Sequence, residues 1–340
     1  MGKDKIRIFD YCWHPAHQWD LVQALKEDCT FTYGLNVKRH WDASSRPLPG
    51  EVRFVTHYEP GAYDVAILHI DQQVVEPFHQ KRMVYEQFNS VITDIPKIVI
   101  NHATPVNPEG FGPECSLSLQ EMEHRCVEGV RSLVGENLMV VNSYAAAGPS
   151  EWGFGYPIVH GMDPAEWYDL PKEPRVFTAL SPRGLDTYYN RDTMIRASDI
   201  LFDEYGYVLC YARLNVDFGD NPEAYKHYLG KSLVYLDTSV RTPMNRARTE
   251  AFLSGCCVVQ VEGAHDLERW AVPGENIILV PDDPAVIART IAGLLEERYT
   301  EALSVGQRGR EMALREFSRE RYRADWLRLL QQVMSQKITS

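Results

Sequence analysis

The sequence predicts an α/β protein made of two Rossmann-like domains, each a doubly wound parallel sheet, that face each other across a cleft. Three observations support this fold class. Short apolar runs alternate with helix-length segments along the chain, which is the pattern of βαβ units. The apolar runs are nearly continuous, as in parallel strands that are buried on both faces. The chain has 340 residues, which fits two domains of about 150 residues better than one core.

Four apolar runs predict the strands of the first domain. Each run is followed by a polar or Gly/Pro-rich connection and then by a helical stretch, so each begins a βαβ unit. The four strands are predicted at residues 6–10, 65–70, 97–102 and 138–143. Because ligands of open parallel sheets bind outside the carboxyl ends of the strands, we expect functional residues directly after these runs.

A proline-rich passage separates the two domains. Pro164, Pro171 and Pro174 precede a new strand at 175–180, and the strand–helix pattern then starts again. Further strands are predicted at 207–212, 232–237, 257–262 and 276–281, and helices at 191–202, 222–229, 245–253 and 284–297. Near the end of the chain, from residue 317 on, apolar and aromatic residues recur at the spacing of a helix. We therefore predict a first Rossmann-like domain at 1–168, a second at 169–316 and a closing helix at 317–340.

Composition narrows the class of protein. Apolar residues make up 44% and charged residues 24% of the chain, as in folded soluble proteins. No apolar run reaches the length of about 20 residues that crosses a bilayer, and no secretory leader precedes the first strand. We therefore expect a cytoplasmic protein, with a peripheral position at the inner membrane as an alternative. The net charge of −12 argues against nucleic acid as a partner.

The seven cysteines are spread along the chain without paired spacing, and several lie in apolar runs. This distribution predicts reduced thiols in the core, in a reducing compartment.

The start of the helix that follows strand 232–237 is the first candidate site. Either Asn245 caps this helix, or Thr242 caps it and Pro243 takes its first position. A helix N-terminus has unpaired N–H groups and about half a positive charge, so it suits a phosphate or diphosphate. Glu250 lies further along and is expected to face a hydroxyl-rich group. The alternative is an ordinary crossover helix whose Glu pairs with a neighbouring Arg.

The sequence from Tyr228 to Leu295 resembles the C-terminal domain of retaining nucleotide-sugar glycosyltransferases of family 4, which have the GT-B architecture. The segment TEAFLSGCCVV (249–259) resembles the EAMAAGTPVV segment of that family, and 263–295 resembles its continuation. HGMDPAEW (160–167) is similar to the NGVD element at the end of the first domain. EFSRERYRADWLRLL (316–330) resembles the closing helix, which in that fold crosses back to the first domain.

The resemblance implies a donor site around this helix. In the family, two Glu residues with seven residues between them enclose the donor, and the backbone amides between them hold the diphosphate. Glu250 matches the second Glu, which binds the ribose hydroxyls, whereas Thr242 replaces the first, which contacts the transferred sugar. Met244, Asn245 and Arg246 fall on the diphosphate-binding stretch, where Asn245 replaces a usual Gly. The Thr242 departure bears on the identity of the sugar and, to a lesser degree, on the activity, and the Asn245 departure bears on the approach of the loop to the phosphate.

Two further candidates follow strands. Arg183 matches the Arg of a family Arg–Lys pair that neutralises the donor phosphates, and Arg191 lies slightly beyond the place of the missing Lys. A cation there would stabilise the leaving diphosphate; the alternative is a surface ion pair. His102 ends a strand and would contact the donor sugar or the developing oxocarbenium ion, unless it is a satisfied core histidine. The catalytic candidates are thus His102, Arg183 and Glu250.

The loop after the first strand is the acceptor-side candidate. Trp13, His14 and His17 lie there, and aromatic rings stack on sugars. His14 and His17 are three residues apart, but no third ligand is near, so no metal is predicted. No cofactor is predicted either, because the nucleotide-diphospho-sugar is a substrate. Phosphate-loop, nucleophile-elbow and dinucleotide-binding motifs are absent from the sequence.

By resemblance, we expect a retaining, metal-independent hexosyl- or related glycosyltransferase. Its donor would be a UDP- or GDP-sugar, and its acceptor a glycan, a lipid-linked glycan or a small molecule. Two alternatives stay open: a GT-B sugar-nucleotide epimerase, and a non-catalytic protein that binds nucleotide sugars. Turnover of the donor without acceptor would favour the first, and tight donor binding without transfer the second.

Overall fold

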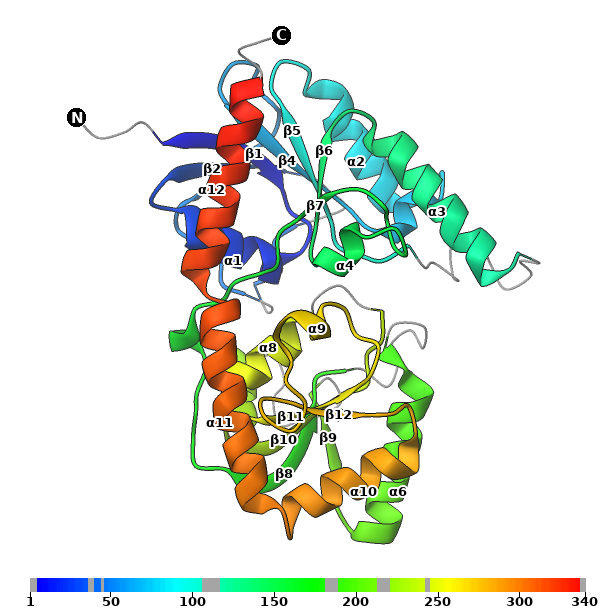
Figure 1. Ribbon diagram of the computed structural model, residues 1–340. Coiled ribbons are helices and arrows are strands. Elements are labelled where there is room, and N and C mark those ends of the chain that lie inside the picture. Colours follow the sequence, from blue (N-terminus) through cyan, green and yellow to red (C-terminus); the bar gives the residue numbers. More distant parts are fainter. Residues whose placement is uncertain are drawn as a thin grey trace. The chain divides into compact units, whose positions relative to one another are not determined.

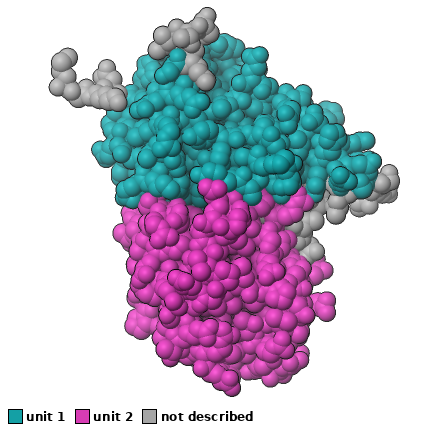
Figure 2. All heavy atoms as spheres, viewed as in Figure 1, with its two compact units in different colours: residues 1–161, 319–340 teal, residues 162–318 magenta. Residues whose placement is uncertain are grey.

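Two separate parallel sheets organise the chain in the computed structural model (Figure 1). The structure describes residues 5–35, 40–43, 46–105, 117–180, 189–212, 221–241 and 245–336, without the side chains of residues 119 and 336. Spatial contacts divide the chain into two units (Figure 2). Unit 1 comprises Met1–Gly161 and Arg319–Ser340, and unit 2 comprises Met162–Ser318.

Within the described ranges, unit 1 contains a seven-stranded sheet and the helices that cover it. Its strands are β1 (Ile6–Tyr11), β2 (Cys29–Gly34), β3 (Val52–Val55), β4 (Val65–Ile70), β5 (Lys97–Asn101), β6 (Leu138–Val141) and β7 (Tyr156–Pro157). Its helices are α1 (Pro15–Leu25), η1 (Gln72–Val75), α2 (Gln80–Val91), α3 (Leu119–Val134), α4 (Tyr144–Ala147) and α12 (Arg319–Gln336).

The sheet of unit 1 has the strand order β3-β2-β1-β4-β5-β6-β7, and every pair is parallel. The order reverses between β1 and β4, which makes their carboxyl ends the topological switch point. Figure 1 shows α1 and α12 on one face of this sheet and α2 and α3 on the other. Alternate residues of the central strands β1, β4, β5 and β6 enter the two cores, so both faces of these strands are buried, as their continuous apolar runs predict.

Helix α12 completes one of these cores. Its aromatic and aliphatic residues pack with α1 and with strands β1, β2 and β4 to β6; they are Tyr322, Trp326, Leu329, Leu330 and Val333. Arg321 Nη2 donates to the backbone oxygens of Val159 and His160, both at 2.7 Å. The C-terminal helix α12 therefore packs against the sheet of unit 1, whose strands come from the N-terminal part of the chain.

Unit 2 contains a five-stranded sheet in the part of the chain that the structure describes. Its strands are β8 (Glu173–Thr178), β9 (Leu209–Tyr211), β10 (Ser232–Asp237), β11 (Cys257–Val261) and β12 (Ile278–Val280). Its helices are η2 (Pro164–Glu166), α6 (Arg191–Tyr205), α7 (Pro222–Lys231), α8 (Arg246–Leu253), α9 (Leu267–Trp270), α10 (Pro284–Leu295) and α11 (Tyr299–Glu316).

The strand order of unit 2 is β12-β11-β10-β8-β9, again parallel throughout. Its switch point lies between β8 and β10. Helices α6, α10 and α11 bury their apolar faces against the sheet in one continuous core. Helix α8 leaves β10 at the switch point, which places its first turn where an open parallel sheet binds ligands.

The predicted fold class is confirmed: two all-parallel α/β sheets are present. Every predicted strand overlaps an observed strand, and every predicted helix an observed helix. Strands β2, β3 and β7 were not predicted. The predicted ranges 1–168, 169–316 and 317–340 stay a prediction, because a division by contacts does not establish which segments fold by themselves. In the described ranges, we find no helix with the length and apolarity required to cross a bilayer.

The described cysteines form no disulfide, and most of them are buried. Burial raises the pKa of the Cys12 thiol to about 12 and that of Cys256 to about 11. A thiol with so high a pKa is almost fully protonated at neutral pH, so these side chains act as core residues rather than nucleophiles. Cys115 lies outside the described residues.

Candidate functional site

Asn245 caps helix α8, the first of the two positions predicted for the cap. Its Oδ1 accepts a hydrogen bond from the backbone N of Ala247 at 3.0 Å. Its Nδ2 donates to Oδ2 of Asp237 at 3.0 Å, and Asp237 is fully buried at the end of β10. The other oxygen of Asp237 accepts from the backbone N of Ser239 at 2.9 Å. Because a carboxylate only accepts, it fixes which way the Asn245 amide points.

Glu250 is held by two neighbours inside unit 2. Glu250 is only 8% exposed. Tyr225 donates its hydroxyl to Oε2 of Glu250 at 2.8 Å, and Arg246 Nη2 lies 3.9 Å from Oε1. An ionised carboxylate has about four acceptor positions, so it can accept hydrogen bonds from protein donors and from ligand hydroxyls together. The Arg–Glu pairing expected of an ordinary crossover helix is thus present, together with an unpredicted tyrosine.

Arg248 packs inside unit 2, although it lies only two residues after Arg246 on α8. It is fully buried, and its Nη1 donates to Oε1 of Gln260 at 2.7 Å. Its guanidinium lies 5.2 Å from the ring centroid of Trp270, a distance typical of a cation–π contact. Burial lowers the pKa of Arg248, while the nearby Asp237 opposes this shift. Arg248 is therefore part of the core.

Several predicted donor residues cannot be placed. Arg183, Thr242 and Met244 lie outside the described residues. Arg191 is the first residue of α6 and pairs with Asp192 at 2.9 Å, with about a third of its side chain exposed. The donor-binding roles of these four residues stay predictions.

In unit 1, Asp10, His69 and His102 form a chain of hydrogen bonds at the switch point. Asp10 is the penultimate residue of β1, His69 is in β4, and His102 directly follows β5. Oδ1 of Asp10 lies 2.8 Å from Nε2 of His69, and Nδ1 of His69 lies 3.0 Å from Nε2 of His102. Both Asp10 and His69 are fully buried, whereas His102 is partly exposed.

The carboxylate sets the tautomers along this chain. Asp10 already accepts from the backbone N of Tyr11 at 2.6 Å and from Nε2 of Gln18 at 3.1 Å. As an acceptor it requires a proton on Nε2 of His69, which leaves Nδ1 of a neutral His69 as an acceptor. His102 must then donate through its own Nε2.

Gln18 connects this chain to the loop that precedes α1. Its Oε1 accepts from the backbone N of Trp13 at 2.8 Å and of His14 at 3.1 Å. Its Nε2 donates to the backbone oxygen of Tyr11 at 2.9 Å as well as to Asp10. One amide thus holds the predicted acceptor-side loop against the end of β1.

The three acceptor-side residues lie around His102. Trp13 is buried and stacks on His69 and His102, with ring centroids 6.1 and 6.5 Å away. The ring centroids of His14 and His17 are 4.5 Å apart, and those of His17 and His102 are 5.0 Å apart. Over the described ranges, no three His, Cys, Asp or Glu side chains are arranged to hold a metal ion. The acceptor-side role of these residues stays a prediction.

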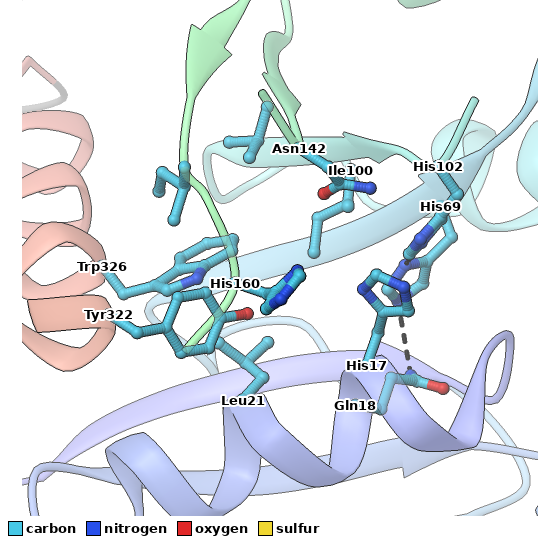
Figure 3. A pocket seen from close by; sticks show the side chains of 12 residues that line it. His17, Gln18, Leu21, His69, Ile100, His102, Asn142, His160, Tyr322 and Trp326 are labelled. Carbon is cyan, nitrogen blue, oxygen red and sulfur yellow. Dashed lines mark hydrogen bonds between the residues drawn. The ribbon is translucent and has the colours of Figure 1, made fainter. Parts of the chain in front are cut away.

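A pocket opens beside His102, with about 350 Å³ of space out to its mouth (Figure 3). It lies between α1, the carboxyl ends of β4 to β6, and α12. Its lining residues are His17, Gln18, Leu21, His69, Ile100, His102, Val140, Asn142, Ile158, His160, Tyr322 and Trp326.

Sequence reasoning missed Asp10, His69, Gln18, Asn142 and Tyr225. A signal existed for two of them, because Asp10 and His69 are polar residues within otherwise apolar strands, where polar groups need a partner. Gln18 and Tyr225 lie on amphipathic helices, where nothing local distinguishes them from ordinary residues.

No family model matches the sequence, and no curated protein sequence matches it either. The similarity appears in solved structures. Anabaena HepE in complex with UDP and glucose has a TM-score of 0.67 with this chain, at 14% identity over 97% of this chain and 100% of HepE. HepE has also been solved with UDP-glucose.

Two further structures show the same likeness. Sucrose-phosphate synthase from Thermosynechococcus elongatus has a TM-score of 0.64, at 13% identity over 97% of this chain and 100% of that one. A glycosyltransferase from Rickettsia africae has a TM-score of 0.62, at 10% identity over 98% of this chain and 99% of that one. The predicted resemblance in fold is confirmed: over nearly its whole length, the chain is similar to nucleotide-sugar glycosyltransferases of the GT-B fold.

Proposed function

We propose that the protein is a glycosyltransferase that moves a sugar from a nucleotide-diphospho-sugar to a hydroxylated acceptor. The observation that carries this proposal is the buried carboxylate of Glu250, held by Tyr225 and Arg246 near the start of α8. A carboxylate fixed in this way, on the helix that follows strand β10 of the parallel sheet, suits the paired hydroxyls of a ribose. The donor is a UDP- or GDP-sugar, and HepE, solved with UDP-glucose, has the same fold.

In the proposed donor site, the diphosphate lies against the first turn of α8, near Met244, Asn245 and Arg246. The Asn245 side chain supplies one capping bond, to Ala247, and N–H groups of this turn and the Arg246 side chain complement the phosphate charge. Arg183 and Arg191 add cations that stabilise the leaving diphosphate. Thr242 replaces a carboxylate beside the transferred sugar and determines, in part, which sugar is accepted.

In unit 1, His102 is the proposed contact to the reacting sugar, and Trp13, His14 and His17 face the acceptor. The hydrogen-bond chain from Asp10 through His69 supports this role, because it presents His102 in one tautomer. A fixed hydrogen-bonding group has little reorganisation to undergo during the reaction. The proposed reaction retains the anomeric configuration and uses no metal ion.

Nucleotide binding by site variants tests the donor site. Isothermal titration of the full chain with UDP, GDP and the corresponding sugar nucleotides should identify one tight-binding base. Glu250→Ala and Arg183→Ala should each weaken that binding about tenfold or more, since each removes a charged partner of the ligand. Tyr225→Phe should weaken it several-fold, because Glu250 loses the hydroxyl that orients it.

Tyr228→Phe is the matched control. Tyr228 lies on the same helix and packs on the same Phe177 ring, but its hydroxyl is directed to Cys210 Sγ. This variant should bind nucleotide as the unmodified protein does. Unchanged affinity in both Glu250→Ala and Arg183→Ala would refute the donor site. Tight donor binding without transfer to any acceptor would instead identify a binding protein, and donor turnover without acceptor an epimerase.

A further inference from the structure

The pocket in unit 1 combines apolar walls with four histidines and the amides of Gln18 and Asn142. Leu21, Ile100, Val140 and Ile158 form aliphatic surface, and Trp326 and Tyr322 form an aromatic side. No lysine, arginine or carboxylate is among its described lining residues. Pockets for small ligands combine apolar walls with a few placed polar groups in the same way. An uncharged ligand therefore fits this lining better than an anion or a cation.

Asn142 is the lining residue whose side-chain amide is available to a ligand within the described part of the chain. It directly follows β6 and is 8% exposed, and Figure 3 shows its amide directed into the pocket. Its side chain makes no hydrogen bond with any described residue, in contrast to Asn137 before the same strand, which donates to Asn89 at 3.1 Å. Buried polar groups are almost always hydrogen-bonded, so an amide at a pocket wall indicates a bound group.

We propose that this pocket binds a hydroxyl group of an uncharged sugar or polyol, with Asn142 as its recognition residue. The enclosed part of the pocket admits a group about the size of one hydroxyl, and the remainder of the ligand lies at the mouth. A hydroxyl both donates and accepts, and the Asn142 amide offers both complements. The identification of this ligand as the acceptor rests on the proposed function. The proposed binding of a sugar or polyol to the pocket does not.

The hydrogen-bond chain from Asp10 makes the pocket selective. Nε2 of His69 is hydrogen-bonded to Asp10, and Nε2 of His102 is hydrogen-bonded to His69. The amide of Gln18 likewise donates to Asp10 and to the Tyr11 backbone and accepts from the backbone of Trp13 and His14. The polar groups of this chain are thus held by the protein, whereas the amide of Asn142, which follows the neighbouring strand β6, is the group that selects the ligand.

Saturation-transfer NMR on the full chain, without nucleotide, tests the proposal. The probes are D-glucose, D-galactose, D-mannose and erythritol, with inorganic phosphate as the anionic competitor. We expect saturable binding of at least one of these probes that phosphate does not displace. Asn142→Leu, which keeps the volume of the side chain, should weaken that binding by about fivefold or more, as expected for lost hydrogen bonds.

Asn137→Leu is the matched control, the same change before the same strand, and should leave probe binding unchanged. Asn142→Ala is a second variant that removes the amide without adding bulk, and it should also lose the probe. The absence of binding for all four probes would mean that only water occupies the pocket and would overturn the proposal. Equal affinity in Asn142→Leu, or displacement by phosphate, would do the same. Because no nucleotide is present, none of these outcomes depends on the donor site.

Discussion

At the scale of single residues, Asp10 is a buried carboxylate with three donors and no solvent. It accepts hydrogen bonds from the Tyr11 backbone, from Gln18 and from His69. Both carboxylate oxygens of Asp10 therefore accept hydrogen bonds, and these donor groups offer no acceptor to a donor at this position. A carboxamide of the same shape would present an NH2 group to Gln18 or to His69, each of which is itself donating.

Asp10→Asn should therefore lower the free energy of unfolding by about 1 to 3 kcal/mol, the cost of a buried group left unsatisfied. Chemical denaturation measures this change. Asp28→Asn is the control, because Asp28 pairs with Arg323 at the surface, where a pair contributes about 0.2 to 1 kcal/mol. Equal losses in the two variants would show that burial of Asp10 has no special effect.

Local signals explain which site residues the sequence could predict. The Asn245 cap was predictable because a cap needs only the residues of its own helix. Tyr225 was not, since its partner Glu250 comes from another helix, and nothing in α7 alone marks that contact. His102 could be named because it ends a strand, but its partner His69 became visible only once β4 and β5 were paired in register.

At the scale of secondary-structure elements, two glycines within helices have opposite surroundings. A Cβ on Gly306 in α11 would overlap the backbone oxygen of Gly255 and lie 3.1 Å from the backbone of Cys256. A Cβ on Gly293 in α10 would meet only Arg298 Cδ, at 3.8 Å. The first glycine permits α11 to approach β11 closely, and the second has no such role.

Gly306→Ala should destabilise the protein by about 1 to 3 kcal/mol through overpacking, although alanine is the better helix former. Gly293→Ala should stabilise it by about 0.5 to 1 kcal/mol, because helix propensity acts there without a clash. Thermal or chemical unfolding of the two variants checks both signs. Stabilisation by both changes would mean that α11 can move away from β11 at little cost.

The same scale shows why some strands were predicted and others were not. Central strands such as β4 are buried along their full length and appear as continuous apolar runs. β2 has exposed and half-buried polar positions, β3 is only partly buried, and β7 has two residues. Strands towards the edge of a sheet need fewer apolar residues, so their sequences differ less from those of loops.

At the scale of the whole molecule, each unit has its own sheet and its own cores. The proposed nucleotide site uses side chains of unit 2 only. Hydrogen exchange with saturating UDP, or with GDP if that is the base bound, should therefore slow in peptides from α7 and α8. Mass spectrometry of the exchanged peptides measures this protection. Protection restricted to unit 1 would contradict the assignment of the donor to unit 2.

The position of α12 in the core of unit 1 has a consequence for synthesis. A nascent chain that has emerged from the ribosome as far as Ser318 contains all of unit 2, yet it still lacks Tyr322, Trp326 and the leucines that cover β1. Domains generally fold as units when their residues are available. The half of the molecule that is translated first can therefore close its core only after the half that is translated later is complete.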